Sequence, residues 1–289
     1  MSDPSLAQRL NENGLRLRDE GNLTSAETSF RAAMAEDPGW SAPVYNLALL
    51  YKYNFQWAES LEFNRAASQI DPNDQGTWWN LGIAATAVGD WNDARRAWSA
   101  CGMNPPAGDG PPDFGWGITP VRLDSDGDAE VVWARRIDPA RAQIVSVPLP
   151  TAKFHWSDVV LIDGAVEGER VVQGRTYPVF RVLQMLVPSG YRTFVIELAT
   201  SSADIVAALE DCAAEAGGAA EDWGTKTRIL CHACSTGVAH YHSDEVSVPA
   251  HPHCGLAARD HDHADAIISA WLARNPRADL ITWFEAPSD

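Results

Sequence analysis

A dense group of residues that can bind metal ions lies near the C-terminal end of the chain. Seven of the eight histidines and three of the five cysteines fall between residues 231 and 263. Cys231 and Cys234 form a C-x2-C pair, and sixteen residues later His251 and Cys254 repeat the two-residue gap. Two such pairs can direct four sulfur and nitrogen ligands at one ion, in the manner of a zinc ribbon. The spacing therefore predicts a Zn²⁺ site.

The histidine ligand of this predicted site is not fixed by the spacing. His240 and His242 would lie on one side of a strand, and His253 is next to Cys254, so each of these histidines could replace His251. Four protein ligands would make the zinc structural, whereas three ligands and a water would leave it catalytic. Both arrangements stay open at the level of sequence.

Motifs for other kinds of catalysis are missing from the sequence. It contains no H-E-x-x-H, no G-x-S-x-G, no phosphate-binding Gly-rich loop with Lys and no dinucleotide fingerprint. Asp244 and Glu245 follow the H-x-H pair closely and could act as the general base of a catalytic zinc. A zinc enzyme is therefore the alternative to a structural zinc site.

The charge of the chain argues against nucleic acid as a partner. There are 39 acidic and 22 basic side chains, a net charge of −17, and the acidic excess is spread along the whole length. Such a chain offers no basic surface for a phosphate backbone. The sequence also lacks the apolar run of about 18 residues that a membrane span needs and the features of a signal peptide. We expect a cytoplasmic protein with no membrane partner.

The first hundred residues repeat with a period of 34. Pro38, Pro72 and Pro106 each close a segment with helical periodicity, which defines units 7–40, 41–74 and 75–108. Small residues recur at the eighth position of each unit, and larger side chains occupy the twenty-fourth, although Asn stands there in the second unit. The eighth positions are Gly14, Ala48 and Gly82, and the twenty-fourth are Phe30, Asn64 and Trp98.

These units resemble the tetratricopeptide repeat (TPR) family. WWNLGIAATAVGDWNDARRAW in the third unit, and VYNLALLY with IDPND in the second, are similar to its consensus. The resemblance implies three antiparallel helix pairs in a short right-handed superhelix, whose first helices line a groove that binds a peptide or a protein. Carried over to this chain, the groove positions most suited to a partner are Arg18, Tyr45, Leu49, Lys52, Tyr53, Trp79 and Ile83.

The rest of the chain predicts a different architecture. After the repeats in 1–106 and a Pro/Gly linker at 107–117, short β-branched runs at 118–189 predict a small bent sheet or barrel, with one helix at VFRVLQML. Residues 190–289 predict an α+β domain with the order βαββαβ, a ferredoxin-like unit with the zinc knuckle inserted. The fold class is thus multi-domain, an all-α TPR superhelix followed by an α+β region.

Two functional hypotheses follow. The first is a cytoplasmic interaction protein, such as an adaptor, a chaperone or an immunity or antitoxin protein, that binds a protein or peptide in the repeat groove and carries a structural Zn²⁺. The second is a zinc-dependent enzyme, for example a hydrolase, whose repeats recruit a protein substrate.

Overall fold

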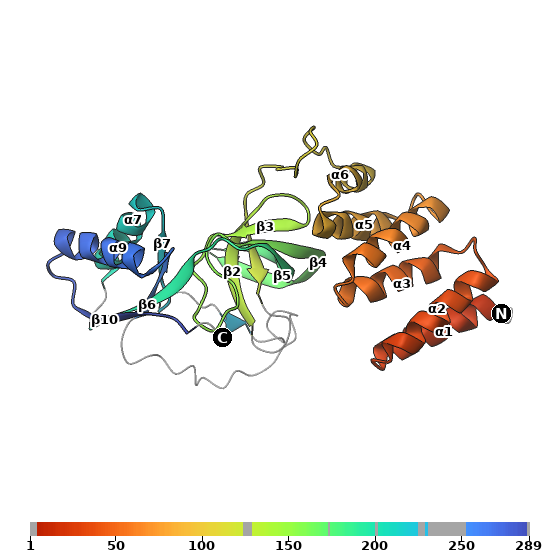
Figure 1. Cartoon of the computed structure of the whole chain (residues 1–289), viewed down its shortest axis with the longest axis horizontal. Coiled ribbons are helices and arrows are strands. Elements are labelled where there is room, and N and C mark those ends of the chain that lie inside the picture. Colours follow the sequence, from red (N-terminus) through yellow and green to blue (C-terminus); the bar gives the residue numbers. More distant parts are fainter. Residues whose placement is uncertain are drawn as a thin grey trace. The chain divides into compact units, whose positions relative to one another are not determined.

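The computed structural model describes residues 5–123, 129–172, 174–199, 202–224, 229–230 and 253–287. The chain divides into two compact units, Met1–Phe114 and Gly115–Asp289, each of which has its own core (Figure 1). In the part of the chain that is described, no helix has both the length and the apolar character to cross a membrane.

The first unit consists of three helix pairs, as the 34-residue period predicts. Within each pair the two helices are joined by a short turn and pack on each other, and each pair also contacts the next (Figure 1). The helices are α1 (Leu6–Asp19), α2 (Leu23–Glu36), α3 (Ser41–Tyr53), α4 (Trp57–Ile70), α5 (Gln75–Val88) and α6 (Trp91–Ala100).

Close packing within each pair depends on a small residue in the first helix. A Cβ atom on Gly82 would lie 2.4 Å from the ring of Trp98, and one on Gly14 would lie 2.6 Å from the ring of Phe30. These two aromatic rings are fully buried. In the first and third pairs, the repeating small residue is therefore the place where a ring of the second helix lies directly against the first helix.

The Pro/Gly segment that follows α6 is held against this helix by one side chain. The Arg95 guanidinium donates to the backbone carbonyls of Pro106 (2.9 Å), Gly110 (2.5 Å) and Trp91 (3.3 Å). The Met103 N–H also donates to the Trp98 carbonyl. These hydrogen bonds therefore hold the segment to the last helix of the stack.

The second unit begins with five strands that close into a ring. Consecutive strands pair antiparallel, β1 also pairs parallel with β5, and a short strand, β8 (Ile229–Leu230), extends the sheet beyond β2. The five strands are β1 (Ile118–Arg122), β2 (Ala129–Arg136), β3 (Arg141–Ile144), β4 (Val159–Val172) and β5 (Arg175–Val187). The ring encloses a core of aliphatic side chains with Phe180.

The helix expected at VFRVLQML is wrong, because these residues form the middle of β5. The β4–β5 ladder shifts register at several points between Val159 and Glu169, and the neighbours Val179 and Phe180 are both buried. The strict alternation of apolar and polar residues that marks a strand is therefore missing from this part of the sequence.

A second sheet of four antiparallel strands follows the ring. Its order is β10-β6-β9-β7, and α7 and α9 pack on one of its faces. The elements are β6 (Arg192–Leu198), α7 (Ala203–Glu215), β7 (Ala219–Asp222), β9 (His253–Ala258), α9 (His261–Arg274) and β10 (Leu280–Glu285). Together with the ring, it gives the second unit two separate sheets.

The other face of the four-stranded sheet carries contacts to the ring. The buried Glu221 carboxylate accepts the Val147 N–H at 2.8 Å, and the Trp223 indole N–H donates to the Val147 carbonyl at 2.9 Å. Gly255 provides the space for Trp223, since a Cβ there would lie 2.3 Å from the indole ring. These contacts join the two sheets of the second unit.

Candidate functional site

Helix α3 has apolar residues on two faces, and only one of them is in the core of the repeats. Leu47, Leu50 and Tyr51 are buried against α2 and its neighbours. Tyr45, Leu49 and Tyr53 follow one another at intervals of four residues, which places them in a row on one face. Tyr45 and Leu49 are partly exposed and Tyr53 is 52% exposed. We call these three residues the α3 stripe.

A polar network lies beside the α3 stripe and links the first helices of the three pairs. The Lys52 ammonium donates to Asn80 Oδ1 at 2.9 Å, and Asn80 Nδ2 donates to the Tyr45 hydroxyl at 3.2 Å. Between α3 and α1, Asn46 Nδ2 donates to Asn11 Oδ1 at 2.9 Å. Each of these three hydrogen bonds joins residues that are about one repeat apart in sequence. The network therefore holds α1, α3 and α5 at a fixed spacing.

Asn46 and Asn80 were not among the groove-facing positions that the TPR resemblance implies, whereas Asn11 takes such a position but was not among those most suited to a partner. Asn46 and Asn80 occupy the sixth position of their units, and Asn11 the fifth position of the first. An Asn at the same position of two consecutive repeats is the signal from which part of the network could have been found. Lys52 was predicted to contact a partner, but it is 2% exposed and its ammonium is directed at Asn80 and lies 5.1 Å from the ring of Tyr53.

The remaining predicted groove residues are divided between surface and core. Arg18 is paired with Asp19 at 2.8 Å and keeps about a third of its side chain exposed. Trp79 is partly exposed and packs edge-on against Trp98, with ring centroids 5.4 Å apart, whereas Ile83 is fully buried. As a result, the accessible part of the predicted groove surface is the α3 stripe with Arg18 and part of Trp79.

Most of the predicted zinc ligands lie outside the described residues. These are Cys231, Cys234, His240, His242 and His251. Among the described residues, no three His, Cys, Asp or Glu side chains are grouped closely enough to hold a metal ion. Of the predicted set, the structure therefore describes only Cys254 and its neighbour His253.

Cys254 lies in the apolar core of the four-stranded sheet. It is fully buried on β9 between Ile196 and Asp222, on the face covered by the helices. Burial, together with the nearby carboxylates of Asp222 and Glu210, raises the pKa of this thiol to about 12. His253 is on the opposite face of the strand, where Nε2 lies 3.4 Å from Glu197 Oε1. The two side chains therefore do not converge.

The two cysteines outside the zinc motif are in different environments. Cys212 is buried in the same core as Cys254, as expected for a small apolar side chain on α7. Cys101 follows the last turn of α6 and is partly exposed, and burial raises the pKa of its thiol.

Solved TPR domains resemble about a third of the chain. The first TPR domain of Spaghetti (RPAP3), bound to the HSP90 peptide SRMEEVD, has 19% identity and a TM-score of 0.32, and the match covers 34% of this chain and 78% of that one. The Sgt2 TPR domain from Aspergillus fumigatus has 21% identity and a TM-score of 0.32, covering 34% and 65%. The TPR2B domain of yeast Sti1, in a complex with pHsp70, has 17% identity and a TM-score of 0.31, covering 32% and 75%.

No protein-family model and no curated protein matches the sequence. At such low identity and TM-score, the solved structures carry no conclusion about what this chain binds. The three helix pairs of the first unit are established by the structure of this chain and by the 34-residue period of its sequence.

Proposed function

We propose that this chain is a cytoplasmic interaction protein that binds a protein or peptide partner on the first helices of its repeat unit. The observation that carries the proposal is the α3 stripe. A helix needs one apolar face to pack into its own domain, and α3 has a second one that the core of the repeats does not use. Exposed aromatic and apolar side chains in a row are typical of surfaces that bind another chain.

The polar network supports the same proposal. Because Asn80 joins both Lys52 and Tyr45, the side chains next to the stripe are held by hydrogen bonds before any partner arrives. A surface that is already ordered loses less conformational entropy on binding. The surface is also linked through Asn46 and Asn11 to α1, where Arg18 offers a partly exposed cation.

Site-specific photo-crosslinking tests this proposal. A photoreactive phenylalanine analogue at Tyr53 should give a discrete crosslinked species in an extract of the source organism, and the Leu49→Arg change should weaken it. The same analogue at Thr28, exposed on α2, is the control position. Equal crosslinking at both positions, or none at Tyr53, would contradict the proposal.

We also propose that the Cys/His segment binds Zn²⁺, as its spacing predicts. The burial of Cys254 in an apolar core favours a ligand set of Cys231, Cys234 and histidines over one that includes Cys254. Measured by elemental analysis, the zinc content should fall in Cys231→Ser and stay at the level of the unmodified protein in Cys254→Ser. Loss of zinc in Cys254→Ser alone would reverse this assignment.

X-ray absorption of the zinc-loaded protein separates the two functional hypotheses for the metal. Four protein ligands would support a structural zinc. An exchangeable water ligand would instead support the alternative, a zinc-dependent hydrolase that recruits its substrate through the repeats.

For the same C-terminal region we propose a ferredoxin-like classification, based on the strand order β10-β6-β9-β7 with α7 and α9 on one face.

A further inference from the structure

The turn between the two helices of each repeat has the same hydrogen bonds in all three pairs. After α3, the N–H groups of Phe55 and Gln56 donate to carbonyls in the last turn of the helix, and the same pair of bonds forms at Gly21 and Gly89. This arrangement requires a left-handed backbone at the first of the two residues. The φ angle is +77° at Gly21 and Gly89, and +59° at Phe55. One of the three turns thus has a bulky residue at a position that suits Gly.

Phe55 gains little packing within the first unit in return for this conformation. A left-handed backbone is strained for an aromatic residue. The Phe55 ring packs edge-on against Trp57, with ring centroids 6.2 Å apart, and the residue is still 56% exposed. Residues in strained conformations are concentrated at functional sites, where the surrounding structure holds them in place. The position of Phe55 therefore indicates a role outside the packing of the repeats.

The same turns carry most of the exposed apolar side chains of the first unit. Because the first helices run in the same direction and stack on one another, the three turns lie on one side of the unit (Figure 1). Among the described residues of this unit, five large apolar side chains are exposed, and four of them are at the turns: Leu23, Tyr53, Phe55 and Val88. Tyr53 also belongs to the α3 stripe, so the apolar surface continues from the stripe onto the turn.

The charged side chains that follow Phe55 in sequence are acidic. Glu59 and Glu62 lie in the first two turns of α4 and are accessible to water, and neither forms an ion pair in the part of the chain that the structure describes. Lys52 is buried and donates to Asn80. An ammonium or guanidinium group can contact both an aromatic ring and a carboxylate, so this surface favours a cationic partner. A second copy of this chain, with a net charge of −17, would be repelled.

We propose that Phe55 is an anchor residue of the partner-binding surface, and that the partner segment on it carries Lys or Arg beside apolar side chains. The apolar side chains would cover Tyr53 and Phe55, and the cations would pair with Glu59 and Glu62. This inference rests on the proposed function, because it gives the chemistry of the partner for the same surface. The strained turn then serves to present the aromatic ring to that partner.

The test titrates the full-length protein with two short labelled peptides and follows fluorescence anisotropy. One peptide consists of Leu and Lys, and the other has Glu at every Lys position. The Leu/Lys peptide should bind and the Leu/Glu peptide should not. Phe55→Gly should weaken binding of the Leu/Lys peptide at least about tenfold, as expected for an anchor residue. Glu59→Gln combined with Glu62→Gln should also weaken it and make it less dependent on salt.

Urea unfolding separates a binding role of Phe55 from a structural one. Phe55→Gly should unfold at the same urea concentration as the unmodified protein or at a higher one, because Gly relieves the strained backbone. Gly21→Ala measures the strain alone, since an added Cβ would have no atom within 4 Å, and its midpoint should fall. A lower midpoint in Phe55→Gly would assign the ring to the packing of the unit and overturn the proposal.

Leu6→Ala is the matched control for binding, because Leu6 is 47% exposed and lies at the opposite end of α1 from the turn. The proposal is also overturned if both peptides bind equally or not at all, if Phe55→Gly leaves binding unchanged, or if Leu6→Ala weakens it as much. The crosslink at Tyr53 tests the proposed function separately. Its absence from the unmodified protein contradicts that function, whereas an equal crosslink in Phe55→Gly contradicts only the role of Phe55.

Discussion

At the scale of single residues, the repeats show how two positions in a helix pair depend on each other. Gly14 lies against Phe30 and Gly82 against Trp98, whereas the second pair has Ala48 and Asn64 at the same places. The Asn64 amide donates to the Ser60 carbonyl and hydroxyl, and Ser60 in turn donates to the Ala48 carbonyl. The departure from the repeat pattern at Asn64 is thus matched by a Cβ on the opposite helix.

This dependence predicts that Gly82→Ala destabilises the first unit. The new Cβ would lie 2.4 Å from the buried Trp98 ring, and overpacking of this kind costs about 1–3 kcal/mol. The higher helix propensity of Ala returns about 1 kcal/mol, so we expect a net loss of up to about 2 kcal/mol in urea unfolding.

The control for this change is Gly76→Ala in the same helix. There the nearest atoms would be 3.4 Å from the added Cβ, which is an ordinary contact, so the variant should unfold at the same urea concentration as the unmodified protein or slightly above it. A loss of stability in Gly76→Ala equal to that in Gly82→Ala would show that the ring contact is not the cause.

At the scale of elements, a cluster of polar side chains ties α2 to α3 and should make the stability of the first unit depend on pH. The Glu27 carboxylate accepts the Tyr51 hydroxyl at 2.7 Å and Arg31 at 2.8 Å. The Tyr51 hydrogen bond, then that of Arg31, lowers the pKa of Glu27 below 4.5. A carboxyl group whose pKa is lower in the folded state contributes stability above its unfolded pKa and loses it as the pH falls through the folded value.

Glu27→Gln should therefore lower stability at neutral pH and have no effect at strongly acidic pH. Because about a third of the Glu27 side chain is exposed to water, the expected difference is below about 1 kcal/mol. Urea unfolding of both proteins in a pH series that crosses 4.5 measures it. Glu36→Gln, at the exposed end of α2, is the comparison. A difference that stays constant through the series would exclude the ionised Glu27 as its source.

The segment after α6 gives a second prediction at this scale. Since Arg95 donates to two carbonyls of this segment, Arg95→Ala should release it and speed its cleavage by a non-specific protease several-fold. Arg96→Ala is the matched variant, because Arg96 is the neighbouring cation but contacts Asp93 and the ring of Trp78. Unchanged cleavage in Arg95→Ala would mean that other contacts hold the segment.

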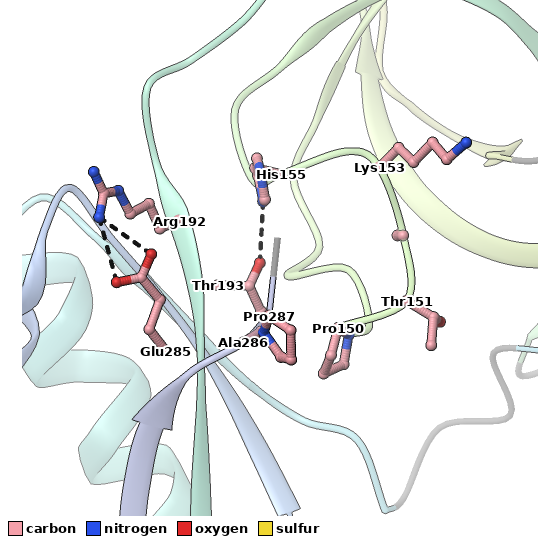
Figure 2. Close-up of a pocket in the computed structure, with 10 residues that line it drawn as sticks. Pro150, Thr151, Lys153, His155, Arg192, Thr193, Glu285, Ala286 and Pro287 are labelled. Carbon is pink, nitrogen blue, oxygen red and sulfur yellow. Dashed lines mark hydrogen bonds and ion pairs between the residues drawn. The ribbon is translucent and has the colours of Figure 1, made fainter. Parts of the chain in front are cut away.

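The elements also show what could be predicted from the sequence. The repeat period is set by residues that recur, so the three helix pairs followed from it directly. The β5 strand could not be recognised, because its register shifts with β4 depend on the partner strand. The burial of Lys52 and Ile83 was also missed, because it depends on side chains of neighbouring helices that the position in the repeat does not specify. The pocket lined by residues 150–153, 155, 192–193 and 285–287 (Figure 2) was missed because its lining comes from segments far apart in the sequence.

At the scale of the whole molecule, the two units have separate cores of different kinds. The core of Met1–Phe114 is made by contacts between helices, and that of Gly115–Asp289 by a strand ring and a helix-covered sheet. Each of these buried clusters consists of residues of one unit, and cooperative unfolding follows such cores. We expect two separate transitions in scanning calorimetry of the full chain.

Two glycine substitutions assign these transitions. Gly82→Ala places a Cβ against Trp98 in the first unit, and Gly255→Ala places one 2.3 Å from the Trp223 ring in the second. Each should lower a different transition by several degrees, since a loss of about 1 kcal/mol shifts the midpoint by about 2–8 °C in domains of this size. If either change lowers both transitions together, the two cores unfold as one cooperative unit, and a partner bound to the repeats would then stabilise the second unit as well.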